Sequence, residues 1–320
     1  MRTLDNGLPR LASRNFLSIL DLGPDELLQA LALASRLKRE RPLGLRAPTT
    51  HALDGRHVGL LFEKPSLRTR VTFTIGVREL GGDVVEIPAD VMHADREPVE
   101  DVARNLERWV DAAVIRTFGQ ERLAFVSDST KNLHVINALS NEEHPCQALA
   151  DLQTLGELWD GAFVGKTVAF VGDGNNVATS LTHAALMLGA SVRVATPEGY
   201  ELPPEVATDA ARIATHGATL AQFIDPREAV RGVDAVYTDV WTSMGQEVEY
   251  AERKKIFTPY QVNEALMALA GPKAVFMHCL PAHRGEEVSD AVIESSASVV
   301  FDQAENRLHA QKAMLLMLLA

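Results

Sequence analysis

The stretch HVGLLFEKPSLRTRVTFTIGVRELGG, residues 57–82, predicts a complete strand–turn–helix unit. Its first part, HVGLLF, is a short apolar run of the kind that forms a buried strand. Pro65 marks a turn, and a helix is expected to begin near Ser66 because serine is a favoured N-cap. The glycine pair 81–82 is expected to end that helix. A strand followed by a helix is the unit from which parallel sheets are built.

The same alternation of apolar runs and helical patterns continues along the chain. Amphipathic stretches such as VEDVARNLERWV (99–110) separate the apolar runs. Repeated units of this kind predict an α/β fold with two domains, each a mainly parallel sheet flanked by helices. The runs expected to form buried strands are HVGLLF (57–62), DVVEI (83–87), DAAVIR (111–116), LHVINA (133–138), TVAFVG (167–172), SVRVAT (191–196), VDAVYTDV (233–240) and KAVFMHC (273–279).

The length of 320 residues also suggests about two domains. A long helix is expected over residues 147–159, between the two sets of apolar runs. We place the domain boundary in this helix, which gives one domain over 1–150 and a second over 151–302. The last segment, 303–320, has apolar residues at helical spacing and is expected to form a terminal helix.

The composition excludes several classes of protein. Lys and Arg number 31 and Asp and Glu 43, so the formal net charge is −12. A surface this acidic argues against nucleic-acid binding and against docking on anionic membranes. The longest apolar stretch, AMLLMLLA, is far below the roughly 20 residues that span a bilayer. The chain has two cysteines and shows no secretory apolar region, so we expect a cytoplasmic protein.

The helix expected after Ser66 carries two arginines in its first turn. Arg68 and Arg70 lie at the positive end of the helix dipole, where they are unfavourable unless an anion lies between them. Backbone N–H groups and the hydroxyls of Ser66 and Thr69 would complete a phosphate site. The alternative is that both arginines pair with nearby acidic residues.

The segment GDGNN, residues 172–176, follows an apolar run and resembles the start of a dinucleotide-binding fingerprint. Val177 replaces the third glycine of that fingerprint, so the pattern is weak. A nicotinamide-dependent oxidoreductase is therefore one alternative. A tight turn whose two asparagines bind a polar small molecule is the other.

Four further polar clusters follow expected strands, on the side where α/β proteins bind ligands. They are VIRTFGQ (114–120), NEEHPCQ (141–147), DVWTSMGQE (239–247) and HCLPAHRGEE (278–287). In the last cluster, Cys279 lies next to His278, and Arg284 follows a few residues later. Such neighbours are compatible with an electropositive thiol, so a Cys/His hydrolase is a possible function. The histidines lack the short paired spacings of a zinc site, so no metal is expected.

Taken together and in order, several motifs resemble the carbamoyltransferases, most closely the ornithine branch of that family. They are SLRTR (66–70), HPCQALADLQT (144–154), DVWTSMGQE (239–247), HCLPAHRGEEV (278–288) and FDQAENRLHAQKA (301–313). The resemblance implies a first domain that binds carbamoyl phosphate, a second that binds L-ornithine and a terminal helix that packs on the first. It also implies a homotrimer or a multiple of trimers and no cofactor. The implied reaction gives L-citrulline and phosphate, and in this family it serves arginine biosynthesis more often than arginine breakdown.

The resemblance further implies roles for individual residues. Leu67 stands where the family usually has Thr, so only its backbone N–H can serve. The residues implied for catalysis are Arg68, Arg116, His144 and Cys279. Those implied for ornithine are Asn176, Asp239, Ser243 and Met244. Those implied for carbamoyl phosphate are Ser66, Leu67, Arg68, Thr69, Arg70, Arg116, His144, Gln147, Cys279, Leu280 and Arg307.

The implied mechanism is direct attack of the neutral δ-amine on the carbamoyl carbon, without a covalent intermediate on Cys279. In the family, the loop at 91–97 helps complete a neighbouring subunit's phosphate site, and here Met92 replaces the usual Gln. A mobile lid is expected at residues 243–245 because of Gly245. The alternatives are a carbamoyltransferase for another amine, such as putrescine or an acylated ornithine, and a non-catalytic binding subunit with the same fold.

Overall fold

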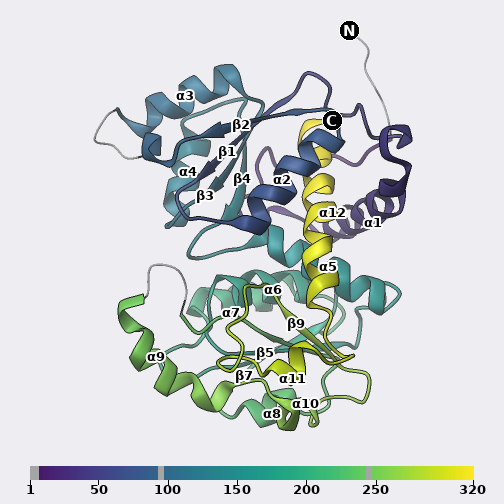
Figure 1. Cartoon of the computed structure of the whole chain (residues 1–320), viewed down its shortest axis with the longest axis vertical. Helices are drawn as coiled ribbons and strands as arrows, with labels where there is room; N and C mark the ends of the chain where they lie inside the picture. Colours follow the sequence, from purple (N-terminus) through teal and green to yellow (C-terminus); the bar gives the residue numbers. More distant parts are fainter. Residues whose placement is uncertain (1–6, 93–96, 243–246) are drawn as a thin grey trace. The chain divides into compact units, whose positions relative to one another are not determined.

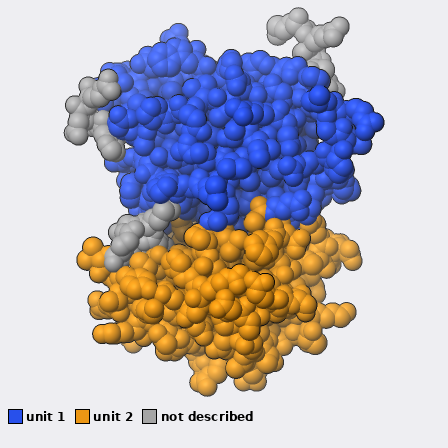
Figure 2. All heavy atoms as spheres, in the orientation of Figure 1, with its two compact units in different colours: residues 1–153, 305–320 blue, residues 154–304 orange. Residues whose placement is uncertain are grey.

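The computed structural model describes residues 7–92, 97–242 and 247–320. The chain forms two compact units, unit 1 (1–153 and 305–320) and unit 2 (154–304), coloured separately in Figure 2. It passes between them within two long helices, α5 (Pro145–Leu158) and α12 (Val300–Leu319). The last sixteen residues of the chain therefore belong to the same unit as its N-terminal half.

Unit 1 contains a four-stranded parallel sheet in the order β2-β1-β3-β4 (Figure 1). Apolar side chains of β1, β3 and β4 are almost fully buried, as their apolar runs predict. The strands are β1 (His57–Phe62), β2 (Asp83–Ile87), β3 (Ala112–Arg116) and β4 (His134–Leu139). The other helices of this unit are η1 (Ile19–Asp21), α1 (Pro24–Glu40), η2 (Arg41–Arg46), α2 (Leu67–Glu79), η3 (Ala89–Met92), α3 (Val99–Trp109) and α4 (Gln120–Asp128).

The prediction that residues 83–87 form a buried strand was wrong in one respect. The strand β2 exists, but it lies at the edge of the sheet and Val85 is 42% exposed. Apolar content predicts that a segment is extended, whereas the burial of a strand depends on its neighbours in the sheet.

Unit 2 contains a five-stranded parallel sheet in the order β7-β6-β5-β8-β9. The strands are β5 (Thr167–Val171), β6 (Ser191–Ala195), β7 (Leu220–Phe223), β8 (Ala235–Thr238) and β9 (Val275–His278). The helices are α6 (Asn176–Met187), α7 (Pro204–Ile213), α8 (Pro226–Val230), η4 (Glu247–Glu249), α9 (Tyr250–Phe257), η5 (Thr258–Tyr260), α10 (Glu264–Met267) and α11 (Asp290–Ile293). The sequence did not predict β7, because this short edge strand carries a glutamine in its apolar run.

In each sheet, the strand that comes first along the chain lies inside the sheet, and later strands are added on both sides of it. The strand β1 pairs with β2 on one side and β3 on the other, and β5 pairs with β6 and β8. Open parallel sheets bind ligands outside the carboxyl ends of their strands at such switch points. The candidate positions are therefore the ends of β1 and β3 in unit 1, and of β5 and β8 in unit 2.

The described parts of the chain contain no helix that is long and apolar enough to cross a membrane. The helix α12 buries most of its side chains but includes charged residues such as Arg307 and Lys312, both almost fully buried.

Candidate active site

The first cluster of the candidate site lies where β1 gives way to α2. The Ser66 hydroxyl accepts a hydrogen bond from the backbone N–H of Thr69 at 3.3 Å, so Ser66 is the N-cap that the sequence predicts. Thr69 is buried, whereas Leu67 is 74% exposed and offers only its backbone to the helix start. The N-terminus of α2 therefore lies at a switch point of the sheet, an arrangement that suits an anion.

The side chain of Arg70 leaves this helix start toward β2. It pairs with Glu86, and its guanidinium lies 4.7 Å from the centre of the Phe62 ring. For Arg70, the structure therefore shows the pairing with a nearby acid that the sequence left open. The positive charge of Arg68, in the first turn of the same helix, acts on His144.

Three arginines surround His144, which lies just before α5 and is 5% exposed. Burial lowers the pKa of His144 well below its ordinary value, and the positive charges of Arg307, Arg116 and Arg68 lower it further. The imidazole is therefore neutral at neutral pH and can donate a hydrogen bond without adding charge. All four side chains belong to unit 1.

The helix α12 contributes Arg307 to this cluster. Arg307 is 2% exposed; it donates a hydrogen bond to the side-chain oxygen of Gln147 and another, at 2.7 Å, to the hydroxyl of Thr69. Gln147 in turn donates to the Asp151 carboxylate at 2.8 Å. These contacts connect α12, α5 and α2. Asp151 is a residue that sequence reasoning missed, although its spacing of four residues from Gln147 on a helix was a usable signal.

Cys146 lies next to these residues but faces the sheet. Its thiol contacts the backbone oxygen of Asn137 at 3.4 Å, and burial raises its pKa to about 12. The thiol is therefore unreactive and acts as a small apolar side chain.

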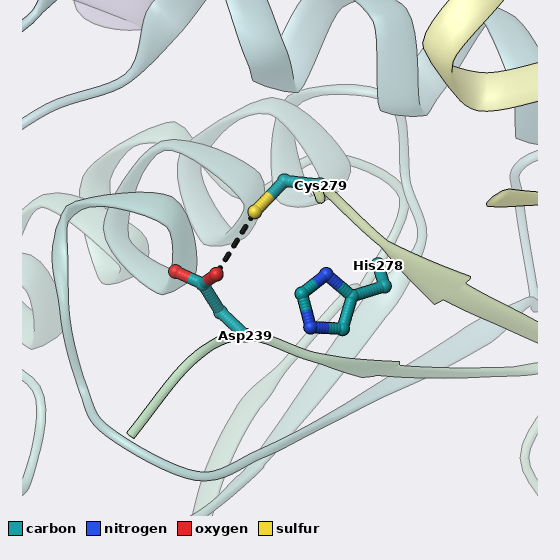
Figure 3. A group of neighbouring side chains, drawn as sticks. All are labelled: Asp239, His278 and Cys279. Carbon is teal, nitrogen blue, oxygen red and sulfur yellow. Dashed lines mark hydrogen bonds between the residues drawn. The ribbon is translucent and has the colours of Figure 1, made fainter. Parts of the chain in front are cut away.

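In unit 2, the candidate residues gather around Asp239, which follows β8 and is 7% exposed (Figure 3). Its carboxylate accepts hydrogen bonds from Asn175 at 2.8 Å and from the Cys279 thiol at 2.9 Å. Asn175 also caps α6 by accepting from the backbone N–H groups of Val177 and Ala178. The residue implied by resemblance, Asn176, is the first residue of α6, and its neighbour Asn175 makes the hydrogen bond to Asp239 described above.

The structure does not favour the electropositive thiol at Cys279 that the sequence left open. The thiol faces a carboxylate, and Arg284 pairs instead with Asp290 at 3.1 Å and Glu294 at 2.6 Å. Nε2 of His278 donates to Glu287 at 3.0 Å and Nδ1 accepts from the Leu280 backbone at 2.9 Å. Both ring nitrogens are therefore occupied, and a Cys/His hydrolase dyad is not supported.

A buried ion pair lies beside this group. Arg253 of α9, which is 4% exposed, pairs with Asp173 and donates to the backbone oxygen of Trp241 at 2.6 Å. Burial raises the pKa of Asp173 to about 6; Arg253 opposes the rise and Asp239 adds to it. Sequence reasoning missed Arg253, because nothing in its local pattern points to a partner 80 residues away.

Two family models match the chain in succession. The one described as "Aspartate/ornithine carbamoyltransferase, carbamoyl-P binding domain" matches residues 14–157, and the one described as "Aspartate/ornithine carbamoyltransferase, Asp/Orn binding domain" matches residues 164–318. The chain belongs to the aspartate/ornithine carbamoyltransferase family.

Individual carbamoyltransferases are similar over nearly the whole chain. An ornithine carbamoyltransferase of a Nostoc species is 49% identical over 306 residues, 95% of this chain and 97% of that protein. One of a Synechocystis species is 48% identical over 314 residues, 98% of this chain and 99% of that protein. The solved ornithine carbamoyltransferase from Pyrococcus furiosus has a TM-score of 0.90 at 45% identity, covering 97% and 98% of the two chains. That from Thermus thermophilus has a TM-score of 0.86 at 45% identity, covering 96% and 99%.

A close packing contact explains the second glycine of the GDGNN turn. In this carbamoyltransferase, a Cβ atom on Gly174 would lie 2.5 Å from the backbone carbon of Glu201, and Gly174 N–H donates to the oxygen of Tyr200 at 2.9 Å. The second glycine therefore serves close packing against a neighbouring loop, which favours the tight-turn alternative over the dinucleotide fingerprint.

Among the residues that the structure describes, two groups of side chains have donor atoms within 4.8 Å of one another, as metal ligands would. One is Asp239, His278 and Cys279; the other is His283, Glu286 and Glu287. In the first group, His278 already uses both ring nitrogens in protein hydrogen bonds. In the second, Glu286 pairs with Lys254 at 2.8 Å. In this carbamoyltransferase, both groups are internal hydrogen-bond networks rather than open ligand sets.

Some predicted positions lie outside the described residues. These are Ser243 and Met244 of the implied ornithine site, Gly245 of the expected lid, and residues 93–96 of the loop that follows Met92.

Proposed function

We infer that the chain is an enzyme with ornithine carbamoyltransferase activity, EC 2.1.3.3. It transfers the carbamoyl group of carbamoyl phosphate to the δ-amine of L-ornithine and forms L-citrulline and phosphate. The observation that carries the assignment of residues is the gathering of Arg68, Arg116 and Arg307 around a neutral His144. Such a cluster suits a substrate with a charged phosphate and a neutral carbamoyl oxygen.

We propose that unit 1 binds carbamoyl phosphate through the start of α2 and the residues around His144. Ser66, Leu67, Thr69 and the arginines Arg68 and Arg70 would hold the phosphate, as in the family motif. Arg70 would have to exchange its contact with Glu86 for this role. Arg116 and Arg307 would contact the carbamoyl phosphate, His144 would donate to the carbamoyl oxygen and Gln147 would contact the carbamoyl amide.

We propose that unit 2 binds L-ornithine. The Asp239 carboxylate, held by Asn175 and Cys279, would accept hydrogen bonds from the cationic α-amine. Asn176, Ser243 and Met244 would contact the α-amino and α-carboxylate groups. Cys279 and Leu280 would lie beside the δ-amine and the carbamoyl nitrogen, where the thiol would tune the pocket.

The chemistry that we propose needs little beyond alignment and electrostatics. A free δ-amine titrates near a lysine, about 10.4, so the site must favour its neutral form. The arginines that bind carbamoyl phosphate disfavour an ammonium beside them. As the nitrogen–carbon bond forms, negative charge grows on the carbamoyl oxygen, where Arg68, Thr69, Arg116 and His144 would stabilise it. The carbon–oxygen bond to phosphate then breaks, phosphate leaves with that bonding pair, and the amine releases one proton.

We further propose a homo-oligomer, for which a trimer is the state implied by the family resemblance. An exposed apolar stripe supports self-association: Leu67, Val71 and Ile75 lie four residues apart on α2 and are 74%, 43% and 37% exposed. The molar mass in solution, measured by light scattering, tests this proposal. A Val71→Asp variant that kept the mass of the wild-type protein would show that the stripe is not the interface.

We also propose a cytoplasmic location and a role in arginine biosynthesis. The two free cysteines, Cys146 and Cys279, are consistent with a reducing compartment. Deletion of the gene tests the direction of the pathway, because only a biosynthetic enzyme is needed for growth without arginine.

The experiment that tests the function is a citrulline assay on the purified protein. Carbamoyl phosphate would be supplied with L-ornithine and, in parallel, with putrescine, N-acetylornithine and L-aspartate. Turnover confined to L-ornithine is expected, because the proposed site holds a free α-amine and an α-carboxylate and presents a δ-amine, and each of the other three compounds lacks at least one of these groups. Turnover with another amine would overturn the acceptor assignment and keep the phosphate site. If the folded protein formed no product with any of these amines, the chain would be a non-catalytic binding protein and the proposed activity would be wrong.

A further inference from the structure

Two charged residues, Glu63 and Lys64, directly follow β1 and are buried. The Glu63 side chain is 2% exposed, and Lys64 is 7% exposed. A buried charge is costly unless it is paired and hydrogen-bonded. The partners of Glu63 and Lys64 therefore indicate which parts of the fold these buried charges hold together.

Lys64 reaches sideways across the sheet. Its ammonium donates to the Asn141 side-chain oxygen at 2.9 Å and lies 4.3 Å from the centre of the Phe118 ring. Phe118 follows β3 and Asn141 follows β4, and the strand order is β1-β3-β4. A single side chain thus connects the carboxyl ends of three adjacent strands, through one hydrogen bond and one cation–π contact.

Glu63 makes a second connection between the same strands. Its backbone N–H donates to the oxygen of Arg116 at 2.8 Å, and its carboxylate accepts from the Thr117 hydroxyl and from Arg122. The backbone of Thr117 continues the connection by donating to Leu139 of β4 at 3.0 Å. The ends of β1, β3 and β4 are therefore joined to one another by side chains as well as by the sheet.

The joined segments carry the residues assigned to carbamoyl phosphate. Ser66 follows Lys64 by two positions, Arg116 precedes Thr117, and His144 follows Asn141 by three positions. We propose that Lys64, supported by Glu63, is a positioning residue for the carbamoyl phosphate site. It fixes the backbone of the phosphate loop at 66–70 relative to Arg116 and His144, so that these three segments are in place before the substrate arrives. This inference rests on the proposed function and names a residue that the family motifs quoted above do not include.

The physical gain is preorganisation. An anion site built from three separate loops loses affinity if those loops must be ordered at the moment of binding. A displacement of about 1 Å in such a site costs on the order of 100-fold in rate. Removing the Lys64 contacts should therefore weaken carbamoyl phosphate and inorganic phosphate binding, while ornithine contacts in unit 2 remain unchanged.

The test compares Lys64→Met, which keeps the aliphatic stem, with Lys64→Arg, which keeps a charge over Phe118. Lys166→Met is the matched control, because Lys166 pairs with Asp234 at 2.9 Å and lies 5.5 Å from the centre of the Trp159 ring. The readouts are the dissociation constant of inorganic phosphate by calorimetry and the KM values of both substrates. Thermal unfolding of every variant measures any general loss of stability.

We expect Lys64→Met to raise the phosphate dissociation constant and the carbamoyl phosphate KM by about tenfold or more, with the ornithine KM within about twofold. Lys64→Arg should recover part of the loss, and Lys166→Met should change neither constant. A Lys64→Met protein with the phosphate affinity of Lys166→Met would overturn the proposal.

A third variant, Asn141→Ala, separates positioning from direct contact. It removes a partner of Lys64 and keeps the ammonium, so it should reproduce part of the loss if Lys64 acts by holding the loops together. Wild-type phosphate affinity in Asn141→Ala, beside a large loss in Lys64→Met, would mean that Lys64 contacts the anion directly and would refute the positioning role. Phosphate binding is measured without ornithine, so a wild-type protein that bound phosphate and formed no citrulline would count against the proposed function alone.

Discussion

The surroundings of His144 in unit 1 and of Asp239 in unit 2 have opposite chemistry. Three arginines surround a neutral imidazole in the first, whereas in the second the carboxylates Asp239 and Asp173 act on each other and Arg253 pairs with Asp173. The first region suits an anion and the second a cationic amine. The difference shows how a chain with a net charge of −12 builds a local cationic site: it draws the arginines together from α2, β3 and α12.

The two regions also move the pKa values of buried groups in opposite directions. Burial is the largest cause in both, because it disfavours the charged form of either group. At His144 the neighbouring arginines reinforce the effect of burial and lower the pKa. At Asp173 the neighbouring Arg253 opposes it, and the pKa still rises to about 6. Substitutions and pH should therefore affect the two regions separately.

The largest expected effect comes from Arg116→Met. Arg116 is 7% exposed at the end of β3, and its loss removes a charge that we assign to the carbamoyl oxygen. We expect kcat/KM for carbamoyl phosphate to fall by about 10²–10³. Arg14→Met is the control, since Arg14 donates to the backbone oxygens of Thr130 and Ser127 and is not among the residues that we assign to a substrate. Steady-state kinetics that showed an equal fall for both variants would contradict the assignment.

The next effect should appear in unit 2. Asp239→Asn removes the carboxylate that we assign to the α-amine, and the KM for ornithine should rise by about 10–10², the usual worth of a charged hydrogen bond. The phosphate dissociation constant should stay within about twofold. Asp225→Asn is the control, because Asp225 forms an exposed pair with Arg227 in the same unit. An Asp239→Asn protein with weaker phosphate binding would mean that the two regions are not independent.

Stability should respond to acid with opposite signs in the two units. In unit 1, burial and the positive charge of Lys312 lower the pKa of His309 to about 4. Between about pH 6.5 and 4 the unfolded chain binds more protons there, so this contribution to stability is lost as pH falls. For Asp173, with a folded pKa of about 6, the folded chain binds more protons between about pH 6 and 3.9, so its contribution rises as pH falls.

Denaturant unfolding at pH 7 and pH 5 measures both contributions. Relative to the wild-type protein, His309→Leu should gain up to about 2 kcal/mol between these pH values, and Asp173→Asn should lose on the order of 1 kcal/mol. Shifts of the same sign in both variants would refute the opposed titration of the two units.

The smallest effect concerns ornithine binding near pH 6. Protonation of Asp173 weakens its pairing with Arg253, which also holds the backbone oxygen of Trp241. The KM for ornithine of Asp173→Asn should exceed that of the wild-type protein by about threefold to fivefold at pH 7, and the two should converge at pH 5. A ratio of KM values that did not change with pH would show that Asp173 does not titrate in this range.

Local patterns predicted much of this protein. The alternation of apolar runs and helical stretches indicated two parallel sheets, and Ser66 was correctly expected to cap α2. The order of the polar motifs indicated the family, which the similarity over nearly the whole chain confirms. These successes share a physical cause: strand and helix periodicity, capping and turn chemistry act over a few neighbouring residues.

Other features depended on which segments meet in space. The exposed edge position of β2 follows from the strand order, and the carboxylate facing Cys279 comes from a residue 40 positions earlier. Arg307 reaches Thr69 across 238 positions because α12 returns to unit 1. The sequence by itself determined most of the strands of the two sheets, and the polar side chains at their ends, although it missed β7. Only the tertiary structure decided which charges share a buried environment, because burial and the distances between charges depend on packing between distant segments.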